Sequence, residues 1–576
     1  MLPIRNSPTG AIWEDTSMRI LVIGAVAAGT SAAAKARRNN EEAEIVVYEK
    51  DAYISYSGCG MPYFIGGHIS KAEELFPRDP AFFKSKYNVD IRTRHEVMAI
   101  DPIKKTIEVK ELTTGTVFTD AYDKLILATG AASVIHPIPG MDSGHVFALR
   151  NIVDMQRISA FIEENKPQRA VIIGTGFIGM EMCENLTDLA VKVTMIEKLP
   201  QVTPGLDADM AFLVQEHVES HGVKVITGVT AVQMDSQQVT LSNGQILPTD
   251  LVISATGVRP NTVLAKQADL VLGATGAIHV NSKMQTSNPD IYACGDCVEQ
   301  MHLITRKPVY RPLGSTANKT GRIAGDSVTG GSLESRGILG TGIFRIFDLT
   351  VAQSGLSERE ASLEGMDVVV CHNIKPDKPE YMGGKDIIIK ALADRTTGRL
   401  IGVQIVGENG VDKRIDVFVT AMTFGAKAED LFHLDLAYAP PYSTTKDPVM
   451  YTGMILDNAI AHGRELVAAK ALDELMESGE KYNLIDVRSP GQYNAGHISS
   501  AENIPQESLR SRADALDKDV VTITYCNKGV TGNAAQNILI NKGFRKVYNI
   551  SGGNKTYRKW KNMQEISPGI AESDPF

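Results

Sequence analysis

Two segments of the chain repeat one pattern, an apolar strand, a glycine turn, a helix and a second strand that ends in an acid. The first has its strand at residues 20–23, its turn at 24–29 and its acid at Glu49. The second has its strand at 170–173, its turn at 174–179 and its acid at Glu197. This is the start of a dinucleotide-binding βαβ unit. The sequence therefore predicts an α/β protein with two Rossmann-like dinucleotide-binding domains.

The glycine turns explain what these units bind. A turn that opens a helix presents backbone N–H groups and the positive end of the helix dipole to a pyrophosphate. Gly174, Gly176 and Gly179 complete a G-x-G-x-x-G motif. The first turn keeps Gly24 and Gly29 but has Val26 at the middle glycine position. Glu197 can accept a hydrogen bond from a ribose hydroxyl and repels a 2′-phosphate, which favours NADH over NADPH, although the adjacent Lys198 reduces this preference.

Composition narrows the class of protein. The formal net charge of −9 disfavours a nucleic-acid partner. No apolar run approaches the ~20 residues that a membrane helix needs, and residues 1–17 lack the apolar core of a signal peptide. We interpret 1–17 as an N-terminal extension before a start at Met18. Six cysteines in 576 residues do not suggest a secreted disulfide scaffold, so we expect a cytoplasmic protein.

Cys294 and Cys297 form a C-x-x-C motif inside a longer signature, and we find no second such motif or histidine pair at ligand spacing. We therefore predict that this pair is structural and that the chain has no metal site. Residues 292–296, Tyr-Ala-Cys-Gly-Asp, resemble the second FAD signature of the two-dinucleotide-binding flavoprotein disulfide reductases. The Ala-Thr-Gly turns at 128–130 and 255–257 resemble the turns that connect their FAD and NAD domains.

This resemblance implies FAD and NAD(P)H as cofactors and assigns residues to each. The FAD residues are Gly24, Ala27, Gly29, Glu49, Lys50, Thr129, Gly130, Asp296 and Ala317. The NAD residues are Gly174, Gly176, Phe177, Ile178, Gly179, Glu197 and Gly257, of which Phe177 either covers the flavin or packs its turn against the sheet.

The same resemblance sets the expected domain order. It places an FAD-binding domain at 18–135 and 255–335, around an NAD(P)H-binding domain at 136–254. An α+β dimerisation domain follows at 336–463, then a linker at 464–472 and a C-terminal α/β domain at 473–576.

Cys59 lies in the segment Ser55-Tyr56-Ser57-Gly58-Cys59-Gly60, directly after the first βαβ unit. In this superfamily such a cysteine lies against the flavin, where a thiolate can attack a sulfur–sulfur bond. A C-x-x-x-x-C partner would fall at position 64, which is Phe64. A single cysteine leaves two chemistries, a mixed disulfide or persulfide with a small thiol, or a sulfenic acid as in NADH oxidases and peroxidases. The first glycine loop lacks the histidine typical of such peroxidases, which favours the mixed disulfide.

The segment around Cys59 resembles that of coenzyme A-disulfide reductases, with Gly58 where that family has asparagine. The resemblance implies coenzyme A as a bound substrate and a homodimer whose partner subunit completes the site. It assigns substrate binding to Lys35, Arg38, Ser55, Asn318, Tyr442 and Lys446, and adds Tyr381 and Tyr438 to the catalytic residues.

Residues 473–576 resemble a rhodanese domain through the motifs at 484–488 and 496–498 and the loop that begins at Cys526. Successive backbone N–H groups of such a loop surround a persulfide. The sixth loop position is Thr531 where the family often has arginine, and Lys528 is the candidate to replace that charge.

Together these features predict an FAD-dependent NAD(P)H reductase of coenzyme A disulfide, coenzyme A persulfide or polysulfide. Cys59 acts as the redox centre and Cys526 as a sulfur carrier. The chain resembles coenzyme A-disulfide reductases fused to a rhodanese domain, the NADH-dependent persulfide reductases. The alternatives are an NADH oxidase or peroxidase with an appended sulfur-transfer domain, and a redox sensor or sulfur-carrier scaffold with negligible turnover.

Overall fold

A computed structural model describes residues 17–566. The first unit is a parallel sheet in the order β18-β7-β1-β2-β3, whose central strand β1 is almost wholly buried. Helices α1 (Ala27–Asn39) and α8 (Gly314–Ser327) pack against each other. They lie so close that a Cβ atom at Gly321 of α8 would be 2.3 Å from the Ala28 carbonyl oxygen of α1. The strands of the sheet are β1 (Arg19–Ile23), β2 (Glu44–Tyr48), β3 (Asp90–Arg92), β7 (Lys124–Leu127) and β18 (Ile291–Ala293), and an antiparallel sheet of β4 (His95–Asp101), β5 (Thr106–Glu111) and β6 (Val117–Ala121) adjoins them.

The second unit is another five-stranded parallel sheet, in the order β12-β11-β10-β16-β9. The chain enters and leaves it through β8 (Ala131–Ser133) and β17 (Val258–Pro260), which pair antiparallel directly after the two Ala-Thr-Gly turns. The elements of this unit are β9 (Val146–Phe147), α4 (Ile152–Asn165), β10 (Arg169–Ile173), α5 (Phe177–Asp188), β11 (Lys192–Ile196), α6 (Ala208–Ser220), β12 (Lys224–Ile226), β13 (Ala231–Met234), β14 (Gln238–Leu241), β15 (Ile246–Pro248) and β16 (Leu251–Ser254).

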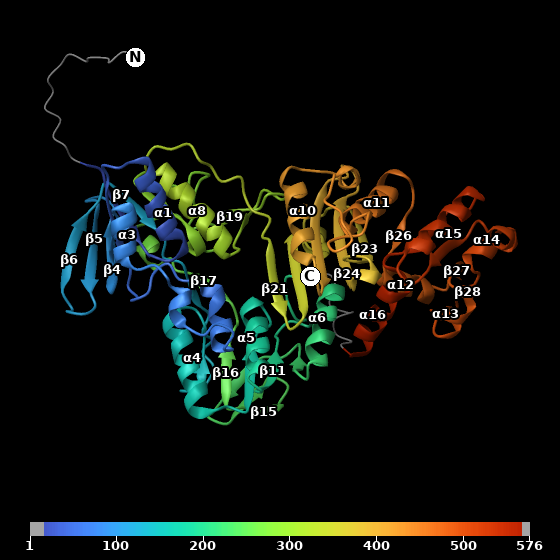
Figure 1. Cartoon of the computed structure of the whole chain (residues 1–576), viewed down its shortest axis with the longest axis horizontal. Coiled ribbons are helices and arrows are strands. Elements are labelled where there is room, and N and C mark those ends of the chain that lie inside the picture. The colour runs from blue at the N-terminus through green and yellow to red at the C-terminus, as the bar shows by residue number, and fades with distance from the viewer. Residues whose placement is uncertain (1–16, 567–576) are drawn as a thin grey trace, which may run out of the picture.

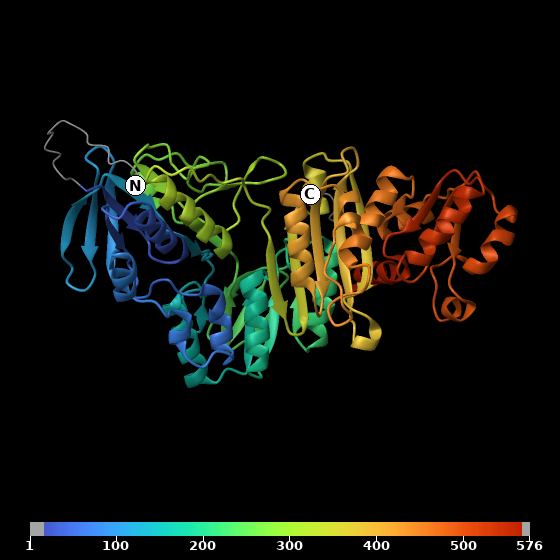
Figure 2. The ribbon, with the colours of Figure 1, turned by 45° about the horizontal axis from the view of Figure 1, so that its top comes forward.

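The third unit is an antiparallel sheet in the order β21-β22-β25-β24-β23, packed against helices α10 and α11. It lies between the dinucleotide-binding units and the C-terminal unit (Figure 1 and Figure 2). Its elements are β21 (Gly342–Ile346), β22 (Leu349–Gly355), β23 (Val368–Pro376), β24 (Asp386–Asp394), β25 (Leu400–Gly407), α10 (Val411–Thr423) and α11 (Pro448–Ala461).

The C-terminal unit is a parallel sheet in the order β26-β30-β29-β27-β28. The range 464–472, expected as a linker, contains β26 and the first residues of α12, because Leu466 and Val467 pair with β30. The elements are β26 (Leu466–Val467), α12 (Ala469–Glu477), β27 (Tyr482–Asp486), α13 (Pro490–Asn494), β28 (Glu502–Asn503), α14 (Gln506–Arg512), β29 (Val521–Tyr525), α15 (Val530–Asn541), β30 (Val547–Ile550) and α16 (Gly553–Ile566).

This C-terminal unit docks on both of its neighbours. Met563 of α16 packs on Phe212 of α6, and both side chains are buried. On β23, the buried His372 contacts Ser551 through Nδ1 at 2.9 Å and Asp209 of α6 through Nε2 at 2.6 Å. The contacts hold the Cys526 loop at a defined place beside the third unit. Between residues 17 and 566 no helix has the length and apolar character needed to cross a membrane.

Candidate active site

The helices that open the two dinucleotide-binding units have free amide groups at their N-termini. Neither α1 nor α5 has a side chain that caps its first turn. Gly24 and Gly174 have φ values of +103° and +99°, which L side chains rarely adopt, and a Cβ atom at Gly29 would lie 1.8 Å from the Gly24 carbonyl oxygen. Two such glycine-lined helix starts fit the pyrophosphates of FAD and NAD(P)H.

The two acids at the strand ends brace these turns. Glu49 accepts hydrogen bonds from the Ala25 amide at 2.7 Å and the Asp51 amide at 3.0 Å. Glu197 accepts from the Thr175 amide at 3.0 Å and the Thr175 hydroxyl at 2.7 Å. Both carboxylates are buried at the glycine loops, so they lie where ribose contact is expected, while the adjacent Lys50 is exposed.

The predicted flavin end of the first unit contains a residue that the sequence did not single out. Arg150 donates to the Asp296 carboxylate at 2.8 Å and to the Ala131 carbonyl at 2.8 Å. It therefore fixes Asp296, the residue expected at the ribityl chain, to the junction of the two domains. Arg150 follows no motif, so only the folded chain brings it to this place. The Thr129 hydroxyl donates to the Asn261 carbonyl at 2.8 Å across the same junction.

Cys294 and Cys297 are buried free thiols beneath this site. The Cys297 thiol donates to the Cys294 carbonyl at 3.2 Å. Their positions agree with the structural role predicted for the pair.

Cys59 is the exposed thiol of the chain, at the entry to the short helix α2 (Met61–Ile65). Partial burial of the Cys59 thiol group raises its pKa. The carboxylates of Glu181 and Asp296 raise the pKa further, and Arg150 lowers it. Glu181 lies on α5 of the second unit, and burial followed by repulsion from Glu184 raises its pKa to about 7. Both dinucleotide-binding domains therefore determine the charge around Cys59.

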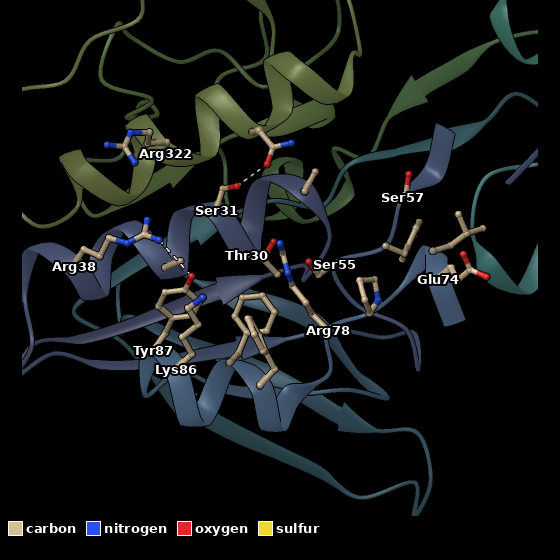
Figure 3. A pocket seen from close by; sticks show the side chains of 18 residues that line it. Thr30, Ser31, Arg38, Ser55, Ser57, Glu74, Arg78, Lys86, Tyr87 and Arg322 are labelled. Carbon is tan, nitrogen blue, oxygen red and sulfur yellow. Dashed lines mark hydrogen bonds between the residues drawn. The ribbon is translucent and has the colours of Figure 1, made fainter. Parts of the chain in front are cut away.

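A cavity of about 690 Å³ opens beside the Cys59 segment (Figure 3). Ser55, Ser57, Asn318 and the predicted Arg38 line it. Ser57 and Arg38 lie at opposite ends of the cavity (Figure 3). The same cavity is lined by three cations that were not predicted from the sequence: Arg78, Lys86 and Arg322. Their pattern of charge and aromatic rings fits a ligand with phosphate groups and a planar base.

Helix α3 (Pro80–Tyr87) supplies the aromatic part of this cavity. The Arg38 guanidinium carbon lies 5.3 Å from the centre of the Tyr87 ring, and that of Arg78 lies 5.8 Å from the Phe82 ring. Lys86 lies 5.2 Å from the Phe82 ring. Cations held over aromatic faces remain available to anions, because the rings carry no formal charge.

Lys35 faces away from the cavity. Its ammonium pairs with Asp326 at 3.0 Å and donates to the Asn39 side chain at 2.8 Å. The α1 residues that line the cavity fall on one helical face, which includes Ser31, Ala34 and Arg38, and Lys35 lies on the next face. The prediction of a substrate contact at Lys35 therefore has no support from its position.

The predicted tyrosines lie on the third unit. Tyr381, Tyr438 and Tyr442 are 75%, 48% and 72% exposed, which is unusual for large aromatic side chains. Lys446, four residues after Tyr442, is also exposed, and its ammonium lies 5.9 Å from the centre of the Tyr451 ring. Asp447, the next residue, caps α11 and forms a buried ion pair of 2.9 Å with Arg414, which fixes the end of this segment.

Phe177 does not cover the first unit in this structure. Its ring lies 5.5 Å from that of Phe344 on β21, and a Cβ atom at Gly342 would lie 2.5 Å from the Phe177 ring. Phe177 thus packs on the third unit, a position that differs from the predicted packing of its turn against the sheet of its own unit. Beside it, Ile178 and Gly179 continue α5, and Gly257 adopts a φ of +102° directly before β17.

Cys526 directly follows β29, at the start of the C-terminal loop, and is 7% exposed. The Cys526 carbonyl accepts from the Asn554 amide at 2.8 Å, and Arg488 holds Asn527 through a hydrogen bond of 3.1 Å. A Cβ atom at Gly553 would lie 2.4 Å from the Cys526 carbonyl oxygen. The loop is thus tightly held around its cysteine.

The candidate cation of this loop, Lys528, is already paired. It forms an ion pair of 2.7 Å with Asp386 of β24. Lys375 of β23 lies 3.8 Å from the Tyr451 ring, and among residues 17–566 no carboxylate acts on it. Burial lowers the pKa of Lys375, as do Lys528 and Lys446, while Cys526 opposes them. An unpaired ammonium near Cys526 therefore comes from the third unit.

Comparison with known proteins agrees with this division of the chain. Residues 18–309 match the family described as pyridine nucleotide-disulphide oxidoreductase, 343–448 match its dimerisation domain, and 468–562 match a rhodanese-like domain. A Methanocaldococcus jannaschii protein named NADH oxidase is 37% identical over 75% of this chain and 97% of its own length. A Pyrococcus furiosus protein named NAD(P)H sulfur oxidoreductase (CoA-dependent) is 36% identical over 76% and 99%. The crystal structure of reduced Bacillus anthracis CoADR-RHD superimposes with a TM-score of 0.93 at 38% identity, over 96% of this chain and 99% of that one.

Proposed function

The chain belongs to the pyridine nucleotide-disulphide oxidoreductases, and from this premise we propose that it reduces coenzyme A disulfide, coenzyme A persulfide or polysulfide with NAD(P)H. The observation that carries the proposal is the position of Cys59. It is a single exposed thiol at the junction of both dinucleotide-binding domains, with Phe64 in place of a second cysteine and a cation-lined cavity beside it.

The redox step belongs to Cys59. Its thiolate attacks one sulfur of a coenzyme A disulfide, a Cys59–coenzyme A mixed disulfide forms, and one coenzyme A leaves as the thiolate. The α1 glycine turn, Glu49 and Asp296 would hold FAD, which would supply the electron pair from NAD(P)H needed to reduce this mixed disulfide to the Cys59 thiolate and free coenzyme A. With a persulfide, the same attack releases sulfide. In this proposal Arg150 and Asp296 position the flavin end of the site, and a tyrosine of the third unit protonates the leaving sulfur.

Coenzyme A is the ligand that best matches the cavity. Its nucleotide end carries phosphates, which suit Arg38, Arg78, Lys86 and Arg322. Its planar base suits the aromatic rings of α3, and its thiol arm would extend past Ser55 toward Cys59.

Cys526 carries sulfane sulfur in this proposal. The loop amides and Lys375 would hold the anionic persulfide, so Lys375 takes the role of the arginine that Thr531 replaces. The Tyr451 ring lies 3.8 Å from the Lys375 ammonium and 5.9 Å from the Lys446 ammonium, so the lysine proposed for the sulfur carrier and the lysine proposed for coenzyme A share one aromatic neighbour.

The exposed tyrosines also support a homodimer. Large aromatic side chains on a unit that matches a dimerisation domain suit a site completed by a second copy of the chain. We further propose NADH over NADPH, because the buried Glu197 repels a 2′-phosphate at its strand end. Six free cysteines suit a reducing cytoplasmic compartment.

An NADH oxidase is the second candidate function, because a relative that is 37% identical over 75% of this chain bears that name and a single cysteine also suits a sulfenic acid. A substrate panel separates the two. NAD(P)H consumption by the FAD-loaded enzyme is measured without oxygen on coenzyme A disulfide, coenzyme A persulfide and polysulfide, and separately on oxygen and peroxide. Turnover on the sulfur substrates is expected, and turnover on oxygen or peroxide alone would overturn the proposal.

The Cys526→Ser variant tests the division of labour between the two cysteines. It should keep coenzyme A disulfide reduction and lose polysulfide processing. Equal loss of both activities would contradict a separate carrier role.

A further inference from the structure

Two histidines and an aspartate meet between α6 and the turn that joins β21 to β22. His217 and His221 stand four residues apart, on one face of α6 and at its C-terminal cap. Asp348 lies in the two-residue turn between β21 and β22. The prediction that the chain has no histidine pair at ligand spacing is wrong, because His217 and His221 are four residues apart and one helical turn brings their side chains together.

The ligand atoms of the three residues already converge. His217 Nε2 lies 2.9 Å from one Asp348 carboxylate oxygen, and His221 Nε2 lies 4.0 Å from the same oxygen. All three ligand atoms lie within 4.8 Å of one another. Ligands of a tetrahedral zinc ion at bonds of about 2.0 Å are separated by about 3.3 Å, so small side-chain rotations suffice to bind one.

The histidines are also prepared as ligands. His221 Nδ1 donates to the His217 carbonyl at 2.9 Å, which leaves Nε2 with its lone pair facing the cluster. The Phe347 ring stacks on the His221 ring at 4.1 Å and 5°, which fixes its plane. His217 Nε2 is buried and, despite the nearby carboxylate, lacks a hydrogen bond of acceptable geometry among residues 17–566. A bound cation would satisfy this atom.

We propose that His217, His221 and Asp348 form a binding site for a divalent transition-metal cation of the zinc class. Two imidazole nitrogens and one carboxylate suit Zn²⁺, whereas Ca²⁺ and Mg²⁺ prefer sites made of oxygen ligands. Water occupies the remaining position of a four-coordinate ion, which makes the site open.

The site joins two domains. His217 and His221 belong to the NAD(P)H-binding domain, and Asp348 belongs to the dimerisation domain. Phe344, on the β21 strand that leads to Asp348, packs against Phe177 beside the predicted nicotinamide site. A bound cation therefore clamps the hairpin to α6 and restrains the strand against which Phe177 rests.

Zinc titration of the full-length, FAD-loaded chain tests this site. Because Zn²⁺ also binds thiolates, calorimetry uses a Cys59→Ser/Cys526→Ser background, in which the remaining cysteines are buried. One Zn²⁺ per chain is expected. His221→Gln and Asp348→Asn should each weaken binding about tenfold or more, since each removes one of three ligands. Zn²⁺ should also raise the unfolding temperature of the background chain and not that of the variants.

The matched control is His462→Ala, which removes an exposed histidine 3.4 Å from Asp457 that has no third ligand beside it in the described chain. It should leave the zinc affinity unchanged. The variants at His221 and Asp348 alter partly exposed side chains, so retained flavin absorbance shows that they fold. A dissociation constant above about 1 mM for the background chain, or equal affinity in the variants, would overturn the proposal.

Discussion

Replacing Glu181 by glutamine should simplify the pH dependence of Cys59 reactivity. Burial, followed by repulsion from Glu184, raises the pKa of Glu181 from 4.5 to about 7. At about 1.4 kcal/mol per pKa unit, this rise corresponds to a cost of roughly 3 kcal/mol for ionising Glu181 in the folded protein. About one-tenth of Glu181 is therefore ionised at about pH 6 and about nine-tenths at about pH 8. An acid with an ordinary pKa would be ionised at both values.

The sign of the effect follows from this titration. Above about pH 7 the Glu181 carboxylate repels the Cys59 thiolate and raises the pKa of the thiol. In the wild-type chain, deprotonation of Glu181 therefore opposes deprotonation of Cys59 as the pH rises. The Glu181→Gln variant lacks this opposition, so its thiolate forms at lower pH.

The assay is the alkylation rate of Cys59 by iodoacetamide as a function of pH, in a Cys526→Ser background whose other cysteines are buried. Wild type should show one inflection near pH 7 from Glu181 and a second from the thiol. The variant should show one inflection and react faster above pH 7. Glu163→Gln, on the exposed face of α4, should match wild type. Coincident profiles for wild type and Glu181→Gln would refute this coupling.

Three further substitutions test other parts of the structure. Lys375→Ala should slow transfer of sulfur from anionic donors to the C-terminal carrier, and Lys375→Arg should retain it, as measured by sulfide release. Arg78→Ala should raise the KM for coenzyme A disulfide about tenfold, since charge-assisted hydrogen bonds contribute about 1.5 kcal/mol or more, whereas Lys84→Ala on the following helix α3, which does not line the cavity, should not. Arg414→Met should lower the free energy of unfolding by up to about 3 kcal/mol in urea, because it removes the buried partner of Asp447 and leaves the more exposed Lys413, 3.6 Å away, as its cation, and Arg414→Met/Asp447→Leu should recover much of this loss.

Much of the fold follows from local pattern. The two glycine turns, the acids at the strand ends and the loop after β29 are each encoded within about 30 residues, a length that specifies a βαβ unit. Apolar runs such as 20–23 and 170–173 form the central parallel strands because both of their faces are buried. The two Ala-Thr-Gly turns also lead into β8 and β17, as expected for connections between the domains.

The parts that could not be predicted depend on contacts between distant segments. Arg150 reaches Asp296 across 146 positions, and Lys375 approaches Cys526 from another domain. Lys35 shows the converse case, because it is only three positions from Arg38 yet pairs with Asp326 of α8 and does not line the cavity. Long polar side chains at no fixed spacing carry no signal until the fold brings them together.

Mass spectrometry of the peptide that contains Cys59 shows directly whether Cys59 forms a mixed disulfide with coenzyme A. The FAD-loaded chain is incubated with coenzyme A disulfide without oxygen, after one equivalent of NADH, and digested without reductant. We expect the Cys59 peptide to carry the added mass of coenzyme A, and we expect further NADH to remove this added mass. An unmodified Cys59, or a Cys59 found only as sulfenic acid after exposure to oxygen, would contradict this expectation.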